Sequence, residues 1–343
     1  MRRLLNTLYV LTADTYLSLE NENVVVNYED KILGRFPLQL FEQICYFGYK
    51  GASPALMGEC ARRGIGLSFF RESGRFLAKV CGNNHGNVLL RKEQYRVSDD
   101  TERSCLLARN FIVGKIYNSR GLLDRTRRDH GLVVDSALLQ TASSRMLQLT
   151  RQARKAVNLD ALRGIEGEAA SVYFSVFNEM ILQNKKCFVF NGRVKRPPTD
   201  AVNALLSFAY TMLANDCASA LEGVGLDSYV GFLHRDRPGR ISLALDLMEE
   251  FRSVVADRFV LTLINNRMIN QKSFKVQENG SVLLSDEAKK IVLNEWQERK
   301  KQVITHPFLN EKLPWGLVPH IQAQLLARYL RGDLEEYPCF MWK

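Results

Sequence analysis

The period of the hydrophobic pattern changes once along the chain, and this change constrains the fold more than any other feature. Over the first 80 or so residues, short runs such as "NTLYVLT", "TYLSLE" and "NVVVNY" are rich in Leu, Val, Tyr and Thr and are separated by polar turns, which is typical of β-strands. From about Val88 onward, apolar residues recur three and four positions apart, as on amphipathic helices. We therefore predict an α+β fold, with a small N-terminal β-rich domain over residues 1–88 and a larger, all-helical domain over residues 89–343.

Each half contains one exception to its pattern. In the first half, "SPALMGECARRG" offers Ser53 as an N-cap, Pro54 at the first helical position and Gly64 as a stop, which predicts a helix among the strands. In the second half, "FKVQENGSVLLSD" predicts one β-hairpin around Asn279-Gly280. We expect the boundary between the two domains near residues 85–92, around "CGNNHGNV".

The net charge is concentrated in one segment. The chain of 343 residues has a formal charge of +10, which favours polyanions or acidic membrane surfaces as partners. Residues 91–163 carry 15 basic and 8 acidic residues, and the basic ones are interleaved with apolar ones at helical spacing. This segment is either a set of solvated helix faces or a surface that binds phosphates. For the second interpretation, the candidate DNA contacts are Arg125, Arg127 and Arg128.

Neither the cysteines nor the apolar stretches indicate a secreted or membrane protein. The seven cysteines are scattered singly, without the close pairs of a zinc site or a disulfide framework. The apolar stretch at the start is interrupted by Asn6, Thr7 and Asp14 and lacks a small-residue cleavage site. No uninterrupted apolar run approaches the roughly 18 residues of a membrane span. We expect a cytoplasmic protein without a membrane partner.

The stretch "GFLHRDRPGRISLALDLMEEF", residues 231–251, combines a histidine with a group of acids. On a helix that begins near Ser242, the acids Asp246, Glu249 and Glu250 lie on one side. Clustered carboxylates persist when they are solvated or when a cation lies among them. The cluster is therefore either a solvated acidic face or a metal site, and His234 is either a surface loop residue or a metal ligand.

A further acid lies between two glycines. In "LRGIEGEAASVYF", Glu166 is flanked by Gly164 and Gly167 at the expected start of a helix, where glycine normally costs stability. One interpretation is that the missing side chains allow another backbone to approach closely. The other is a glycine-rich helix start, with the glutamate favourably placed near the positive end of the helix dipole.

Together these residues suit phosphodiester chemistry. Two carboxylates and an imidazole form a reasonable site for a divalent cation, and a cation can orient a hydroxyl nucleophile and neutralise charge on the oxygens around phosphorus. Arginines beside such a site suit an incoming phosphate. The candidates are Arg163, beside the glutamate motif, and Arg235, Arg237 and Arg240, beside the histidine.

Three blocks of sequence carry a resemblance to a known family. In order they are "LRGIEG", "RPPTDAVNALLSFAYTML" and "GFLHRDRPGRISLALDLMEEFR", within residues 162–257, and they resemble the CRISPR-associated integrases that insert new spacers, the first-numbered Cas proteins. "GRFLAKVCGNNHGNVLLRKEQYR" and "YPCFMWK" resemble the type I-C branch. Departures from the family pattern are Ala209 in place of a frequent Gly, Ser253 in place of a common Pro, and Cys339 within the usual Pro-Pro.

The resemblance implies a fold and a set of ligands. The fold is an N-terminal β domain followed by a helical catalytic domain. The ligands of the catalytic metal, Mg²⁺ or Mn²⁺, map onto Glu166, His234 and Glu249, with Asp246 as an auxiliary catalytic acid. Glu250 matches no ligand position of the family and is expected to point elsewhere around the helix.

The resemblance also implies an activity and partners. The activity is that of a metal-dependent DNA endonuclease and integrase, which joins 3′-hydroxyl ends of short foreign DNA to the CRISPR repeat by transesterification. The implied partners are double-stranded DNA, a second copy of the chain and a dimer of the second-numbered Cas protein. Two alternatives remain: a structure-selective nuclease that cuts branched DNA in repair, and a DNA-binding scaffold whose metal site is not catalytic.

Overall fold

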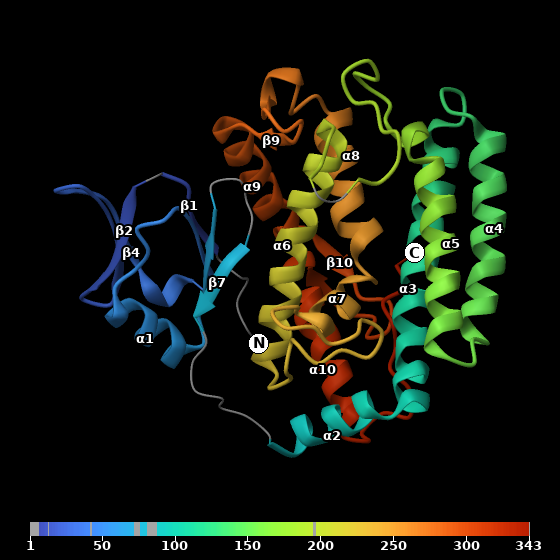
Figure 1. Ribbon diagram of the computed structural model, residues 1–343, viewed down its shortest axis with the longest axis horizontal. Helices are drawn as coiled ribbons and strands as arrows, with labels where there is room; N and C mark the ends of the chain where they lie inside the picture. Colours follow the sequence, from blue (N-terminus) through green and yellow to red (C-terminus); the bar gives the residue numbers. More distant parts are fainter. Residues whose placement is uncertain are drawn as a thin grey trace. The chain divides into compact units, whose positions relative to one another are not determined.

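The computed structural model describes residues 7–12, 14–41, 43–71, 76–80, 88–194 and 197–342. These residues form two compact units (Figure 1). Unit 1 takes its residues from 1–86, 286–302 and 314–317, and unit 2 takes its residues from 87–285, 303–313 and 318–343. The stretch 81–87, on which the predicted boundary depends, lies outside the described residues.

Unit 1 contains two β-sheets. A four-stranded sheet has the order β1-β5-β6-β7, in which β1, β5 and β6 are parallel and β7 is antiparallel to β6. A three-stranded antiparallel sheet has the order β2-β3-β4. The strands are β1 (Thr7–Val10), β2 (Thr15–Glu20), β3 (Asn23–Tyr28), β4 (Lys31–Pro37), β5 (Gln43–Phe47), β6 (Gly66–Phe70) and β7 (Phe76–Val80).

The helix predicted among these strands is present. Helix α1 (Pro54–Arg63) is capped by the hydroxyl of Ser53, which accepts the N–H of Leu56 at 3.2 Å. It ends at Gly64, whose φ of 69° is the left-handed conformation that glycine adopts without strain. The helix buries Leu56 in a core that also contains Leu17 and Ile44. Alternation on the strands and apolar spacing on the helix thus supply one apolar core.

Unit 1 also takes residues from much later in the chain. Helix α9 (Asp286–Lys301) and the short 3₁₀ helix at Trp315–Leu317 belong to it. The side chain of Gln297 on α9 donates a hydrogen bond of 3.3 Å to the carbonyl of Thr7. The hydrophobic period indicates such a helix but carries no information about which core it joins.

Unit 2 is helical, so the predicted order of a β-rich region followed by a helical region is confirmed. Helices α3, α4 and α5 lie side by side (Figure 1), and the 30 residues of α3 bury Phe111, Ile112 and Lys115 in the middle of the helix. The helices are α2 (Val88–Asp99), α3 (Thr101–His130), α4 (Ser136–Arg154), α5 (Leu159–Ser175), α6 (Ala201–Gly223), α7 (Ser242–Met248), α8 (Arg258–Asn265) and α10 (Val318–Leu330), with a π-helix at Arg252–Asp257 before α8.

Side-chain caps set the starts of the main helices of unit 2. In each case a carboxylate or amide oxygen accepts a backbone N–H of the first helical turn, which would otherwise lack a partner. The capping residues are Asp100 for α3, Asp135 for α4, Asn158 for α5 and Asp200 for α6. These residues are readable in the sequence and explain why the predicted helices begin where they do.

Two short β-ribbons complete the described structure. The predicted hairpin is confirmed: β8 (Phe274–Val276) pairs with β9 (Val282–Leu284) across a turn that contains Gly280 at a φ of 75°. A second pair, β10 (Val303–Thr305) with β11 (Lys312–Pro314), was not predicted. No helix among the described residues is long and apolar enough to cross a membrane.

Glu250 anchors the C-terminal tail within unit 2. Its carboxyl is fully buried and accepts the N–H of Phe340 at 2.6 Å, the hydroxyl of Tyr337 at 2.8 Å and the amide of Gln322 at 3.1 Å. Asn118 on α3 donates to the carbonyls of both Glu250 and Phe340 at 2.7 Å. This network joins α3, the segment after α7, α10 and the tail, so the acid serves the packing of unit 2.

Glu250 also makes the stability of the protein depend on pH. Burial raises the pKa of its carboxyl from 4.5 to about 8, although the three donors oppose that rise. The folded protein therefore keeps a proton on Glu250 over a range in which the unfolded chain has lost it. The stabilising contribution is complete below pH about 4.5 and is lost as the pH rises through about 8.

We predict that, between pH 4.5 and about 8, the free energy of unfolding falls less steeply with rising pH in Glu250→Gln than in the wild type. The glutamine is neutral at every pH, so it removes the cost of a buried carboxylate at alkaline pH, on the order of a few kcal/mol. Urea denaturation of both proteins at several pH values measures the effect. Asp257→Asn is the matched control, because burial raises the pKa of Asp257 only to about 6. An unchanged slope above pH 6 in Glu250→Gln would contradict the prediction.

Candidate active site

Helix α5 carries Glu166 in its middle, and the expectation of a helix start is wrong. The helix begins at Leu159, so the dipole of its first turn does not explain the glutamate. The expected close approach of another backbone is also wrong, because a Cβ on Gly164 or Gly167 would meet no atom of the described residues within 4 Å. The two glycines instead leave open space on the helix surface beside Glu166.

Asp246, on α7, organises the loop that carries the histidine. Its carboxylate is fully buried and accepts the backbone N–H groups of Phe232 at 2.6 Å, Leu233 at 2.9 Å and His234 at 3.0 Å. Gly231 is required in this loop, because a Cβ there would lie 3.0 Å from Oδ2 of Asp246. Asp246 therefore fixes the backbone that precedes the imidazole.

The same carboxylate orients the imidazole ring. Nδ1 of His234 lies 2.6 Å from Oδ1 of Asp246, and a carboxylate can only accept, so we assign the proton to Nδ1. Nε2 is then left with a free lone pair, and it lies 4.0 Å from Oε1 of Glu249. A carboxylate that holds the far nitrogen of a histidine in this way is the usual support of a metal-ligating imidazole.

The three acids of this region do not share one solvated face. Helix α7 ends at Met248, and Glu249 and Glu250 lie in the turn before the π-helix. Asp246, Glu249 and Glu250 are at most 3% exposed, so the alternative of a solvated acidic face is wrong. The break in the helix lets Glu249 face His234, while Glu250 faces the tail as expected from its mismatch with the family ligands.

Lys115, on α3, lies between two of the predicted metal ligands. Its ammonium group donates a hydrogen bond to Glu166 and lies 2.8 Å from Oε2 of Glu249, while Arg252 lies 3.0 Å from Oε1. Burial by itself raises the pKa of the Glu249 carboxyl, but the positive charges of Arg252 and Lys115, chiefly, outweigh it and lower the pKa to about 2. Glu249 is therefore a buried carboxylate that stays ionised.

The donor types of the three predicted ligands suit a divalent cation, and the Lys115 ammonium lies against two of them. Within the described part of the chain, no three His, Cys, Asp or Glu side chains are grouped so that they could hold a metal ion. Oε2 of Glu249 is nevertheless buried, with the Lys115 ammonium 2.8 Å away as its counterion, and Nε2 of His234 lies 4.0 Å from the other carboxylate oxygen. With the ammonium moved aside, Glu166, His234 and Glu249 offer the oxygen and nitrogen donors that Mg²⁺ or Mn²⁺ takes.

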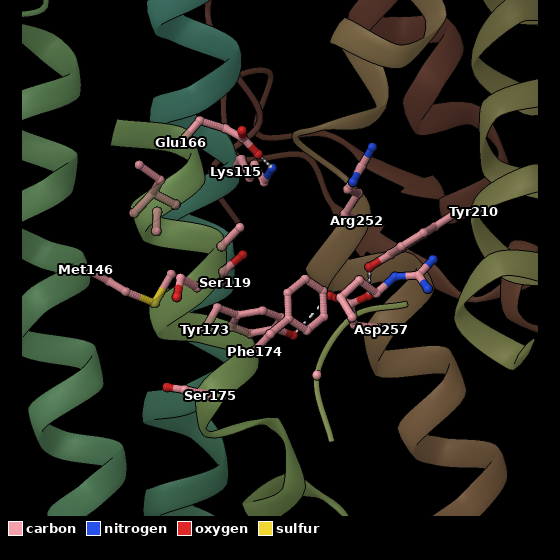
Figure 2. A pocket seen from close by; sticks show the side chains of 16 residues that line it. Lys115, Ser119, Met146, Glu166, Tyr173, Phe174, Ser175, Tyr210, Arg252 and Asp257 are labelled. Carbon is pink, nitrogen blue, oxygen red and sulfur yellow. Dashed lines mark hydrogen bonds and ion pairs between the residues drawn. The ribbon is translucent and has the colours of Figure 1, made fainter. Parts of the chain in front are cut away.

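A cavity of about 440 Å³ opens beside these side chains (Figure 2). Glu166 and Lys115 lie at one end of it, and Tyr210 and Asp257 lie towards the other end. Its apolar wall comes largely from α5, including Phe174. The cavity thus connects Glu166 to the aromatic and cationic side chains around Asp257.

The far end of the cavity holds a buried acid with two phenols. Asp257 accepts the hydroxyls of Tyr210 at 2.5 Å and Tyr173 at 3.0 Å. Burial raises the pKa of the Asp257 carboxyl to about 6, although these two hydrogen bonds lower it. The guanidinium groups of Arg252 and Arg193 lie 5.0 and 5.3 Å from the centre of the Tyr210 ring, a distance typical of cation–π contacts. Tyr210 therefore helps to position Arg252 beside Glu249.

Sequence reasoning missed Lys115, Arg252, Tyr210 and Asp257. Two signals were available. Lys115 interrupts the apolar run "FIVGKIY" four residues after the buried Phe111, and a lysine on the apolar face of a helix is rarely buried without a partner. Tyr210 and Arg252 both lie within the sequence blocks that carry the family resemblance.

The arginines proposed beside the site differ in their surroundings. Arg163 donates to the carbonyl of Leu233 at 2.7 Å and pairs with Asp160 at 2.7 Å, so it ties α5 to the histidine loop. Arg235 and Arg237 are exposed next to His234, and Arg235 lies 3.6 Å from Asp160. Contact of these arginines with DNA stays a prediction, as it does for Arg240.

The arginines at the end of α3 also differ from one another. Arg125 lies 3.4 Å from Asp129 and 5.7 Å from the ring centre of Trp342, and it lines a second cavity of about 500 Å³. Arg128 is exposed and lies 2.9 Å from Asp129. Nε of Arg127 is buried without a hydrogen bond among the described residues. Arg125 and Arg127 are partly exposed and Arg128 is exposed, and contact of all three with DNA stays a prediction.

Comparison with known proteins gives the family. The family model described as "CRISPR associated protein Cas1" matches residues 8–298. A relative from Rhodospirillum rubrum, named "CRISPR-associated endonuclease Cas1 2", is 50% identical over 347 residues that cover all of both chains.

Solved structures share the fold at low sequence identity. A "Casposase bound to integration product" aligns with a TM-score of 0.84 and 21% identity over 99% of this chain and 95% of that chain. A chain of a "Cas6-RT-Cas1--Cas2 complex" aligns with a TM-score of 0.81 and 22% identity over all of this chain and 36% of that chain. The family model, together with the relative that matches over its whole length, shows that this chain belongs to the Cas1 family of CRISPR-associated proteins.

Proposed function

We propose that this chain is a metal-dependent DNA endonuclease and integrase that acts in CRISPR adaptation. The observation that carries the proposal is that one buried ammonium contacts both Glu166 and Glu249, while Nε2 of His234 lies 4.0 Å from Glu249 and Asp246 supports the imidazole. The names of the full-length relative, an endonuclease, and of the casposase with its integration product support the same chemistry.

The proposed reaction is transesterification. The 3′-hydroxyl oxygen of a short foreign DNA forms a bond to phosphorus at the edge of a CRISPR repeat, and the bond to the 3′ oxygen of the cleaved repeat strand breaks. That oxygen leaves and takes up a proton, so the number of phosphodiester bonds is unchanged. In hydrolysis, water replaces the attacking hydroxyl. One site therefore serves both cutting and joining.

The chain's own residues would prepare the phosphate for this reaction. A bound Mg²⁺ or Mn²⁺, held by Glu166, His234 and Glu249, would polarise the phosphate and lower the pKa of the attacking hydroxyl. Asp246 keeps the proton on Nδ1 of His234, so that Nε2 remains a donor of electrons. Arg252 keeps Glu249 ionised. The exposed Arg235 and Arg237 lie where they can hold the DNA backbone next to the histidine.

We further propose that the protein acts as a homodimer with a dimer of Cas2 on double-stranded DNA. The support is the name of the complex that contains a chain of this fold, "Cas6-RT-Cas1--Cas2", and the excess of basic residues in segment 91–163. The type I-C assignment and the cytoplasmic location stay predictions of the sequence.

We predict that Glu249→Gln abolishes Mn²⁺ binding and strand joining, whereas Glu250→Gln keeps both. The first change removes a carboxylate that faces His234, and the second removes one that faces the tail. Calorimetric titration with Mn²⁺ and a joining assay on a CRISPR repeat measure the two properties. Glu250→Gln is the matched control, because it makes the same chemical change one residue away. Joining by Glu249→Gln at the wild-type rate would contradict the assignment of the ligand.

We also predict that Glu166→Ala and His234→Ala lose both cutting and joining by at least about 10³-fold while binding DNA normally, because each removes a proposed ligand rather than a core contact. Asp246→Asn should be intermediate in activity and less stable, since the amide's N–H₂ faces backbone N–H donors. Gel assays that score cut and joined products separately, on repeat and branched DNA, distinguish an integrase from a repair nuclease. Cutting of branched DNA without any joining in the wild type would favour the repair nuclease.

The basic segment, residues 91–163, is expected to supply affinity for DNA of any sequence. Neutralising Arg125 and Arg128 together, as Arg→Gln, should weaken binding to unrelated duplexes alike and reduce the slope of log Kd against log salt by roughly one to two, because each lost phosphate contact lowers it by about one. Fluorescence anisotropy at several salt concentrations measures this. Neutralising Arg331, which lies outside the segment and pairs with Asp333, is the control. An unchanged slope in the double variant would mean that these arginines are only a solvated surface.

A further inference from the structure

Lys115 occupies a position that a bound metal would need. Its ammonium contacts Glu166 and Glu249, two of the three proposed ligands, and its side chain is only 11% exposed. A divalent cation held by the same two carboxylates would lie within a few ångströms of this ammonium. At such a distance the repulsion between the two positive charges is large in a site sheltered from water. The lysine in this position and the metal therefore exclude each other.

Arg252 cannot play the same role. Among the residues that the structure describes, its guanidinium pairs with one carboxylate, that of Glu249 at Oε1, and it is held against the Tyr210 ring at 5.0 Å. Charges elsewhere in the site are balanced by fixed partners, since Asp246 is held by three backbone N–H groups and His234. Lys115 is the cation that bridges two ligands, and its flexible four-carbon stem allows it to move.

The cavity beside the site provides space next to the Lys115 ammonium. Lys115 itself lines the cavity of about 440 Å³, together with Ser119 one turn further along α3 (Figure 2). A rotation about the side-chain bonds would carry the ammonium out from between the carboxylates into this space. The cavity provides open space next to the present position of the ammonium.

We propose that Lys115 is an exchangeable counterion: it holds Glu166 and Glu249 in place before the divalent cation binds, and it turns into the cavity when the cation takes their oxygens. The inference rests on the proposed metal-dependent function. Before loading, the ammonium prevents two carboxylates from facing each other uncompensated. The cost of displacing it lowers the metal affinity, so the lysine sets the concentration at which the site is loaded.

The test is calorimetric titration of Mn²⁺ into the DNA-free, full-length protein at one neutral pH. Because lysine and metal compete, Lys115→Met should bind Mn²⁺ roughly tenfold more tightly than the wild type, within the range typical of coupling between two binding events. Lys155→Met, which removes an exposed lysine at the end of α4, should bind like the wild type. A lysine that merely supports the fold predicts the opposite, so equal or weaker binding by a folded Lys115→Met would overturn the proposal.

A second measurement needs no variant of Lys115. Acetylation of the wild-type protein by a water-soluble reagent, read by mass spectrometry, reports the exposure of each lysine with and without Mn²⁺. Lys115 should react several-fold faster in the presence of Mn²⁺, while Lys155 should not change. Saturation of the site by Mn²⁺ with no change at Lys115 would overturn the exchange, even if Lys115→Met failed to fold.

Glu249→Gln separates this proposal from the proposed function. Mn²⁺ binding by the wild type that disappears in Glu249→Gln supports the metal site, and the behaviour of Lys115 then decides the exchange alone. Absence of Mn²⁺ binding in both the wild type and Lys115→Met would overturn the metal-dependent function, and the exchange with it. Binding of Mn²⁺ by Lys115→Met but not by the wild type would support the exchange, because the lysine would then block the site completely.

Discussion

Three acids of one short segment are buried, and the need to compensate them organises unit 2. Transfer of a carboxylate out of water is unfavourable unless charges or hydrogen bonds replace the water. Asp246 meets this need with backbone N–H groups and an imidazole, Glu249 with two cations, and Glu250 with neutral donors and a proton. The three acids play different roles because their partners differ. Asp246 orients the imidazole, Glu249 keeps a negative charge in the site, and Glu250 packs the tail against the rest of unit 2.

Helix α3 supplies partners to both Glu249 and Glu250. Lys115 reaches Glu249 from one turn, and Asn118, less than one turn further, binds the carbonyl of Glu250 and that of Phe340 in the tail. The same stretch of helix therefore supports both the charged site and the docking of the C-terminus. Gly114 next to Lys115 allows this crowding, because a Cβ there would lie 3.3 Å from the Glu250 side chain and 3.4 Å from that of Cys339. A loss of packing at the C-terminal tail would therefore also disturb Lys115, because Asn118, which binds the tail, lies three residues from it on α3.

The sequence could predict the features that depend on local pattern. The order of strands and helices, the cap at Ser53 and the hairpin at Gly280 follow from residues that are neighbours in the chain. The pairing of Lys115 with Glu249 could not be predicted, because helical spacing gives a face of a helix but not the partner of that face. For the same reason, alternation and periodicity did not indicate that α9 joins unit 1. The interruption between α7 and the π-helix was also hidden, since the apolar spacing continues through Phe251 while the backbone turns.

A series of contacts joins Glu249 to the far end of the cavity through Arg252, Tyr210 and Asp257. Glu249 stays ionised partly because of Arg252, whose guanidinium is held over the ring of Tyr210, whose hydroxyl is in turn bound by Asp257. Asp257 has a pKa of about 6, so its charge changes just below neutral pH, at the far end of this series of contacts. A proton gained there weakens the acceptor that positions Tyr210 and removes a negative charge that Arg252 and Arg193 share. Arg252 therefore lies between the proposed ligand Glu249 and a buried acid that touches none of the proposed ligands, and the aromatic wall that holds Arg252 is part of the site.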